Sequence, residues 1–128
     1  NGIDSGKIID QIQYNLKKND TARDNYLKLM STSVSLFIKL FDFLSKGNYS
    51  TEKQVEKNST YYARNEINYK LIEINFDTTL LNIHNQIRAL IFPPYQLPVV
   101  NEKKIIKSKL FDDHIILTDI NNNEQIYQ

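Results

Sequence analysis

The most informative stretch for the architecture, residues 19–47, reads NDTARDNYLKLMSTSVSLFIKLFDFLSKG. Apolar side chains recur at helical spacing from Tyr26 to Leu44, which gives one side of a helix a wide apolar stripe. Thr21 followed by Asp24 is close to a capping box, and Gly47 is typical of a helix C-terminus. The stretch therefore predicts one long helix that packs its stripe into a core, with a partner-binding surface as the alternative.

Upstream of this helix, residues 7–16 have the period of a strand rather than of a helix. The apolar positions alternate with polar ones and are Ile8, Ile12, Tyr14 and Leu16. Asp10 falls on the same face, so we expect the start of the strand to leave the sheet. Residues 1–6 contain Asp-Ser-Gly, which is typical of a turn.

Downstream, the polar residues 48–66 predict a long surface connection, followed by a short apolar segment over residues 71–76. Asp77 is the expected N-cap of a second helix that ends before Pro93-Pro94, because proline cannot donate the helical hydrogen bond. One face of this helix is apolar and carries Leu80, Leu81, His84, Ile87 and Ile91.

Residues 99–128 change character and contain β-favouring groups separated by turn residues. The groups are Val99-Val100, Ile105-Ile106, Leu110-Phe111, Ile115 to Leu117 and Ile126-Tyr127. They predict an antiparallel hairpin or meander of three or four strands, which should pack on another part of the chain because so few short strands form no core alone. The expected parts are thus residues 1–47, 48–98 and 99–128.

Composition excludes several classes of protein. The 16 basic and 15 acidic residues give a net charge of +1, so a dedicated nucleic-acid binder is not expected. Cysteine is absent, which excludes a disulfide framework and cysteine-based sites. No secretory leader and no apolar run of about 20 residues is visible, so we expect a cytoplasmic protein that does not span a membrane.

Taken one at a time, the polar residues do not define an activity. His84 and His114 lie far apart in the sequence, and adjacent residues such as Asp112-Asp113-His114 rarely converge on one ion. No metal site and no glycine-rich phosphate loop is therefore expected. Asp4 alone is a turn residue.

Four short segments, taken in order, resemble the formyltransferases that use 10-formyltetrahydrofolate. GIDSGKI at residues 2–8 is similar to the aspartate loop of that family, and DTA at residues 20–22 to the start of its long helix. TYYAR at residues 60–64 and IHNQIRAL at residues 83–90, followed by PPY, are similar to its later segments. The resemblance covers residues 1 to about 98.

This resemblance implies an α/β fragment: the end of a Rossmann-like catalytic domain (one strand plus the long helix), then a second helix and the antiparallel hairpin or meander. It implies that Asp4 is catalytic and orients a histidine, and that Gly2, Ile3 and Asp4 lie near the pterin of 10-formyltetrahydrofolate, without a metal. The Asn-x-His of the family precedes its aspartate, so we expect this chain to be inactive alone. Asn82-Ile83-His84 has the same spacing by coincidence.

The tail favours one branch of the family. It is short and not basic, and Gln96-Leu97-Pro98 stands where the transfer-RNA branch has Gly-Ala. The resemblance therefore implies a dTDP- or UDP-linked amino sugar as substrate and a homodimer formed through residues 99–128. Tyr62 or Tyr95 would line the nucleotide or sugar site and Arg64 or Arg88 would approach the diphosphate, although packing or surface exposure explains each equally well.

Two other functions remain open from the sequence. The chain would be part of a methionyl-transfer-RNA formyltransferase if a long basic domain follows it. In a different class of function, the helix and strands would serve only dimerisation or partner binding, without catalysis.

Overall fold

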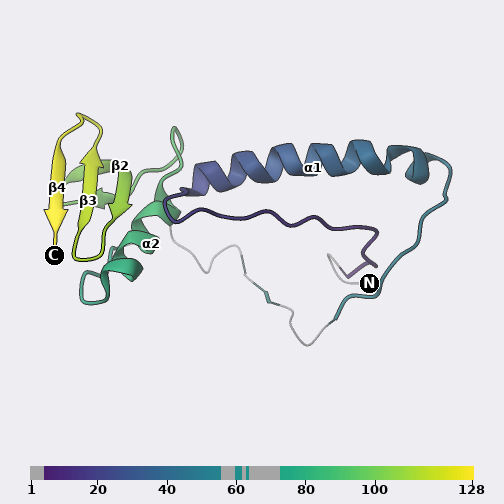
Figure 1. Ribbon diagram of the computed structural model, residues 1–128, viewed down its shortest axis with the longest axis horizontal. Helices are drawn as coiled ribbons and strands as arrows, with labels where there is room; N and C mark the ends of the chain where they lie inside the picture. Colours follow the sequence, from purple (N-terminus) through teal and green to yellow (C-terminus); the bar gives the residue numbers. More distant parts are fainter. Residues whose placement is uncertain (1–4, 56–59, 62, 64–72) are drawn as a thin grey trace.

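The computed structural model describes residues 5–55, 60–61, 63 and 73–128. Two helices and a four-stranded sheet form within them. The bounds are α1 Ala22–Ser45, α2 Leu80–Leu90, β1 Val99–Val100, β2 Lys103–Leu110, β3 Ile115–Asp119 and β4 Glu124–Tyr127. Figure 1 shows α2 and the sheet as one packed unit, from which α1 extends away.

Helix α1 begins and ends as its sequence predicts. The Thr21 hydroxyl accepts a hydrogen bond from the Asp24 backbone N–H at 3.2 Å, and the Asp24 carboxylate accepts from the Thr21 N–H at 2.9 Å. This capping box satisfies donors that the first helical turn leaves unpaired. Gly47 follows the helix with φ +64°, a left-handed conformation that costs glycine nothing.

The expected packing of the α1 stripe into a core is wrong for the described part of the chain. No residue of α1 is buried, and Phe37, Ile38 and Phe41 are 57%, 69% and 55% exposed. Helical periodicity predicts which face of a helix is apolar, but it does not say whether another layer of the protein covers that face.

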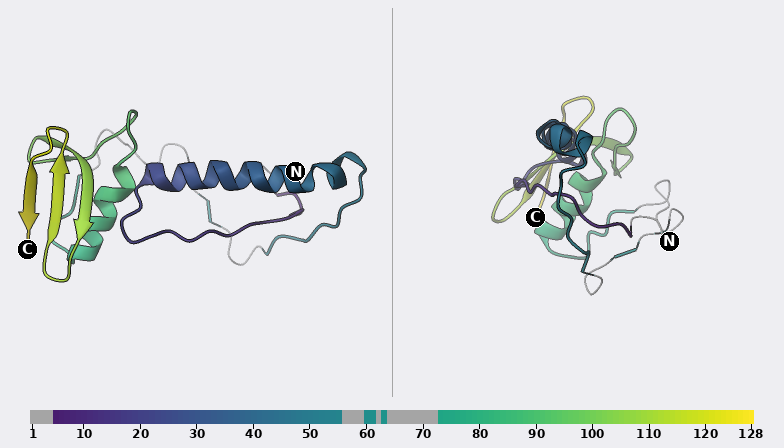
Figure 2. Two further views of the ribbon diagram at one scale, coloured as in Figure 1. Left: turned by 45° about the horizontal axis from the view of Figure 1, so that its top comes forward. Right: turned by 90° about the vertical axis from the view of Figure 1, so that its right-hand side faces the viewer.

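The predicted strand over residues 7–16 is also wrong, because these residues form no strand. Within the described part of the chain, their one bridge joins Ile8 to Glu52, where each backbone N–H donates to the other residue's carbonyl at 2.8 Å. The segment instead runs alongside α1 (Figures 1 and 2). Alternation in a sequence favours extended backbone, but a strand forms only where a neighbouring strand supplies its hydrogen bonds.

Helix α2 begins two residues later than predicted. Thr79 is the N-cap, and its hydroxyl accepts from the Asn82 N–H at 3.3 Å. The backbone N–H of Asp77 instead donates to the side chain of Asn75 at 2.8 Å, in a turn that precedes the helix. The predicted end is confirmed, since Ile91 caps the helix and the Pro93-Pro94 bond, which is cis, follows.

The predicted C-terminal meander is confirmed. The strands are antiparallel in the order β1-β2-β3-β4, and Ser108 pairs with Leu117 while Ile116 pairs with Ile126. Ile105-Ile106 and Leu110, which belong to two separate β-favouring groups in the sequence, lie in the single strand β2. Asn101 and Asn122 have positive φ angles of 48° and 64° in the connections, which suits the tolerance of asparagine for that region.

The core of the described chain lies between α2 and one face of the sheet. Its buried apolar residues are Ile83, Ile87, Ile91, Val100, Ile105, Ile115 and Leu117. The tail thus packs on α2, as its few strands require. No helix among the described residues has the length and apolar character that crossing a bilayer demands. The division into residues 1–47, 48–98 and 99–128 stays a prediction.

Candidate functional site

Five of the predicted site residues lie outside the described residues: Gly2, Ile3, Asp4, Tyr62 and Arg64. The chain immediately after the aspartate loop is described. There the Gly6 carbonyl accepts from Gln54 Nε2 at 2.6 Å, next to the bridge between Ile8 and Glu52. Residues 6–8 are therefore attached to residues 52–54.

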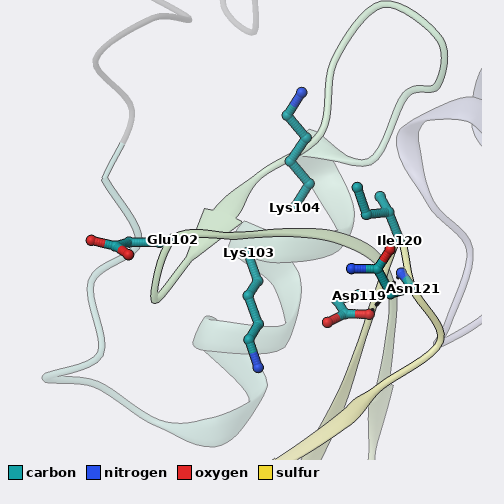
Figure 3. Close-up of a pocket in the computed structure, with 6 residues that line it drawn as sticks. All are labelled: Glu102, Lys103, Lys104, Asp119, Ile120 and Asn121. Atoms are coloured by element: carbon teal, nitrogen blue, oxygen red, sulfur yellow. Dashed lines mark hydrogen bonds between the residues drawn. The ribbon is translucent and has the colours of Figure 1, made fainter.

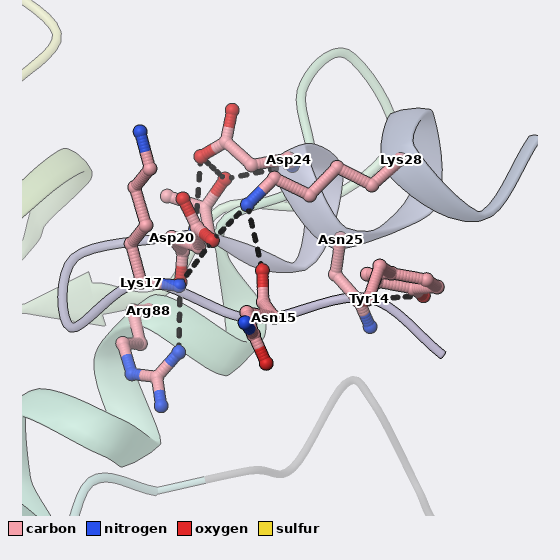
Figure 4. Close-up of polar contacts among 9 residues, drawn as sticks. Tyr14, Asn15, Lys17, Asp20, Asp24, Asn25, Lys28 and Arg88 are labelled. Atoms are coloured by element: carbon pink, nitrogen blue, oxygen red, sulfur yellow. Dashed lines mark hydrogen bonds and ion pairs between the residues drawn. The ribbon is translucent and has the colours of Figure 1, made fainter. Parts of the chain in front are cut away.

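A polar junction forms where the loop before α1 meets α2 (Figure 4). The Asp20 carboxylate accepts from the Lys17 N–H at 2.6 Å and pairs with Lys28 on α1. The Asp20 carbonyl accepts from Arg88 Nη1 on α2 at 2.8 Å. Because Lys28 and then the Lys17 N–H donate to it, the pKa of the Asp20 carboxyl is lowered from its ordinary 3.8. Asp20 thereby joins the loop, α1 and α2.

A cavity of about 440 Å³ opens beside this junction. It is lined by Leu16, Asp20, Thr21, Ala22, Asn25, Asn85, Arg88 and Ala89. Arg88 Nε donates to the Asn85 side chain at 2.8 Å, so two of the three guanidinium nitrogens hold the protein together. The predicted residue Arg88 thus lines a polar cavity and also has a structural role.

Tyr95 lies elsewhere. It is 83% exposed, and its ring centroid is 5.9 Å from that of Phe92, which lies 5.4 Å from that of Tyr26 on α1. Tyr95 is absent from the lining of the Arg88 cavity. Arg88 and Tyr95 are the two predicted substrate residues that the structure describes. They do not line the same cavity.

His84 is fully buried and structural, as expected for a lone histidine on a helix face. Its Nε2 donates to the Lys18 carbonyl at 3.0 Å, so in the neutral ring Nδ1 accepts from the Ser108 hydroxyl at 2.8 Å. Burial lowers the pKa of this imidazole from its ordinary 6.5, and the positive charges of Arg88 and Lys18 act in the same direction. His84 therefore links the 17–20 loop, α2 and β2.

Two other groups of polar residues provide no site. His114 is engaged with Asp113 at 2.6 Å and stacks on Phe111, and no group of three potential metal ligands occurs in the described ranges. A cavity of about 250 Å³ lies between the β1–β2 and β3–β4 connections. In Figure 3 its Glu102, Lys103 and Lys104 side chains point in different directions, so their charges do not converge on one ligand.

Sequence reasoning missed the junction around Asp20. Thr21 and Asp24 were recognised as caps, but nothing in the local pattern indicates that Lys28 and Arg88 meet at Asp20. Arg88 lies 68 positions away in the chain, so only the tertiary structure brings it to the loop.

Comparison with known proteins decides the family. No family model matches the chain. It superposes over its whole length on WlaRD, a sugar 3N-formyltransferase crystallised in the presence of dTDP and 5-N-formyl-THF, with a TM-score of 0.82 and 40% identity. The N-formyltransferase from Helicobacter canadensis, in complex with folinic acid and dTDP-3-aminofucose, gives 0.81 and 39%.

The chain belongs to the formyltransferase family. Among curated proteins, the methionyl-tRNA formyltransferase of Clostridium acetobutylicum is 30% identical over 129 residues, which cover 95% of this chain and 41% of that protein. That of Borrelia hermsii is 27% identical over 114 residues. This formyltransferase chain spans 51% of WlaRD, so it represents about half of the fold.

Proposed function

We propose that this chain is part of an N-formyltransferase that transfers the formyl group of 10-formyltetrahydrofolate to the amine of a dTDP- or UDP-linked amino sugar. The observation that carries the proposal is the likeness to two sugar N-formyltransferases at 40% and 39% identity over the whole chain. The methionyl-tRNA formyltransferases are more distant, at 30% or less.

In this proposal Asp4 is the catalytic carboxylate. The reaction forms a bond between the sugar nitrogen and the formyl carbon, breaks the bond from that carbon to the folate nitrogen, and removes a proton from the amine. A histidine from the other half of the fold would take the proton and deliver it to the leaving folate nitrogen, and Asp4 would fix the orientation of this histidine and favour its charged form. Gly2 and Ile3 would lie beside the pterin. The contacts of residues 6–8 with residues 52–54 hold the described chain that follows these residues.

Substrate binding is proposed for four residues. Arg88 lines a polar cavity and would contribute its positive charge to a diphosphate mainly at long range, since Nε and Nη1 already donate to Asn85 and Asp20. Tyr95 would stack on the base or sugar, because its ring is largely exposed. Tyr62 and Arg64 retain the same roles as predictions from the sequence.

The test is Asp4→Asn in the full-length protein, assayed for formyl transfer from 10-formyltetrahydrofolate to dTDP-3-aminofucose. We expect kcat/KM to fall by about 10²- to 10⁴-fold, because the amide cannot hold the histidine in its charged form. Asp10→Asn is the matched control, since the contacts of the Asp10 carboxylate are at the surface: it accepts from the Gln11 N–H at 2.8 Å and lies 3.4 Å from Lys39. Wild-type rates in Asp4→Asn would show that Asp4 is not the catalytic aspartate.

A second candidate, formylation of methionyl-transfer RNA, is favoured by the names of the curated relatives. The same preparation assayed with methionyl-transfer RNA separates the two: we expect transfer to the amino sugar alone. Transfer to neither amine would instead favour the non-enzymatic module, in which the chain serves dimerisation or partner binding.

A further inference from the structure

A side-chain hydrogen bond holds the backbone just after Asp4. Gln54 Nε2 donates to the carbonyl of Gly6 at 2.6 Å. Gly6 is the second residue after Asp4 in the sequence, and Gly6 and Gln54 lie 48 positions apart. The contact therefore joins the start of the described chain to a residue that no local sequence pattern relates to it.

The backbone supplies a second attachment close by. Ile8 and Glu52 each donate their N–H to the carbonyl of the other residue at 2.8 Å. The Gln54 amide and this bridge engage alternate residues on both segments, so together they restrain the direction of the backbone as well as its place. Of these hydrogen bonds, the one from Gln54 is nearest to Asp4 in the sequence.

Packing does not hold this part of the chain. Residues 5–7 are exposed, and a Cβ added at Gly6 would meet no atom within 4 Å. A segment with few buried contacts opens easily unless hydrogen bonds restrain it. The amide of Gln54 is therefore a direct restraint on the backbone that follows Asp4.

The contacts that come next along the chain are weaker. The Asp10 carboxylate lies 3.4 Å from Lys39 of α1 at the surface, where ion pairs contribute little. Beyond Ile8, no backbone ladder joins residues 9–16 to another described segment. Residues 52–54 therefore provide the strongest attachment that the structure describes for the start of the chain.

We infer that Gln54 is a positioning residue for the formyl transfer: its amide holds the backbone that follows Asp4 and thereby keeps the Asp4 carboxylate aligned with the histidine that takes the proton. The inference rests on the proposed function, in which Asp4 orients that histidine. A displacement of about 1 Å at a catalytic group can reduce the rate about a hundredfold, so a restraint on the neighbouring backbone affects catalysis without touching the substrate.

The test uses the full-length protein and formyl transfer from 10-formyltetrahydrofolate to dTDP-3-aminofucose. Gln54→Met keeps the length of the side chain but lacks the N–H donor, and Gln54→Lys restores a donor on a side chain of similar length. Glu52→Ala is the matched control, because the bridge of Glu52 to Ile8 uses backbone atoms that the change leaves in place. Since Gln54 is exposed, we expect all three variants to fold, and circular dichroism checks this.

We expect Gln54→Met to lower kcat about tenfold with little change in KM, Gln54→Lys to recover part of that loss, and Glu52→Ala to keep the wild-type rate. The acidic limb of the pH profile of kcat/KM should move to lower pH in Gln54→Met, because a displaced Asp4 raises the pKa of the histidine less. In an Asp4→Asn background, Gln54→Met should add no further loss, since a residue that acts through Asp4 has nothing left to position.

Wild-type kcat in Gln54→Met, together with a strongly impaired Asp4→Asn, would overturn this inference and leave the proposed function standing. A further loss of about tenfold in the Asp4→Asn background would also overturn it, because Gln54 would then act independently of Asp4. Wild-type rates in Asp4→Asn would contradict the proposed function and this inference together.

Discussion

At the scale of single residues, His84 connects three segments that are distant in the sequence. Both ring nitrogens have partners, in Lys18 of the loop and Ser108 of β2, and the side chain is fully buried. A buried polar side chain of this kind stabilises a fold only as long as its hydrogen bonds are complete. His84 therefore couples the position of the 17–20 loop to the packing of α2 on the sheet.

Replacing His84 by alanine should destabilise the protein by about 2–4 kcal/mol, because the change leaves a cavity and removes the partner of two buried polar groups. The measurement is urea unfolding followed by circular dichroism. His114→Ala is the control, and we expect it to cost less than about 1 kcal/mol, since the pair of His114 with the exposed Asp113 is at the surface. Equal losses in the two variants would contradict the role of His84.

The lowered pKa of His84 also predicts a pH dependence of stability. Below the ordinary pKa of 6.5 the unfolded chain binds a proton at this position while the folded chain does not. The free energy of unfolding should therefore fall as the pH drops below about 6.5, until the pH reaches the folded pKa. Unfolding measured between about pH 7.5 and 5 tests this, and His84→Gln should flatten the curve.

Three acidic residues affect the stability of the protein at lower pH than His84 does. The pKa values of Asp20, Asp113 and Asp119 are lowered from 3.8 by hydrogen bonds from Lys28, His114 and Asn123. Their contribution is present above that value and is lost as the pH falls through the folded pKa values. A loss of stability confined to pH below 4 would therefore point to these carboxylates and contradict the histidine prediction.

At the scale of elements, the capping box makes the start of α1 a local property of the chain. Thr21 and Asp24 satisfy each other's backbone donors, while Arg23 N–H also donates to the Ile91 carbonyl at 3.2 Å. Thr21→Ala should destabilise the first turn by about 1 kcal/mol. Amide hydrogen exchange of Asp24 and Asn25 should accelerate about fivefold.

Thr32→Ala, in the middle of α1, is the control for this prediction. It removes a threonine without touching a cap, so the first turn should exchange at the wild-type rate. If both variants accelerate exchange at Asp24 to the same extent, the helix frays as a whole and the capping box does not fix its start.

Elements were predictable where short-range patterns specify them. The bounds of α1 follow from its caps, and the turns of the meander follow from Asn101 and Asn122. The start of α2 was not predictable in this way, because Asp77 and Thr79 are both good N-cap residues. In the structure the Asp77 N–H donates to the side chain of Asn75, and Thr79 is the N-cap. The candidate site was predicted less well, since Arg88 and Tyr95 are described but lie apart.

At the scale of the whole molecule, the sheet has a second face that α2 does not cover. Ile115 and Leu117 point toward α2, so Ile116 and its partner Ile126 lie on the opposite side, where Ile126 is 64% exposed. This face is suited to the homodimer predicted for residues 99–128. Ile126→Glu in the full-length protein should halve the mass measured by light scattering.

Gln128→Glu introduces the same charge at another exposed residue and should leave the mass unchanged. A monomeric wild-type protein would exclude the dimer altogether. A dimer that persists in Ile126→Glu would place the interface on another surface of the molecule.

The sequence by itself determined α1, the approximate extent of α2, the meander and the family, because caps, periodicity and turn residues act over a few positions of the chain. Only the tertiary structure decided that His84 and Arg88 hold the 17–20 loop, that residues 9–16 form no strand with another described segment, and that no residue of α1 is buried in the described part of the chain. Strand pairing and burial depend on what lies across from a residue, and the neighbours of a residue in the sequence do not specify that.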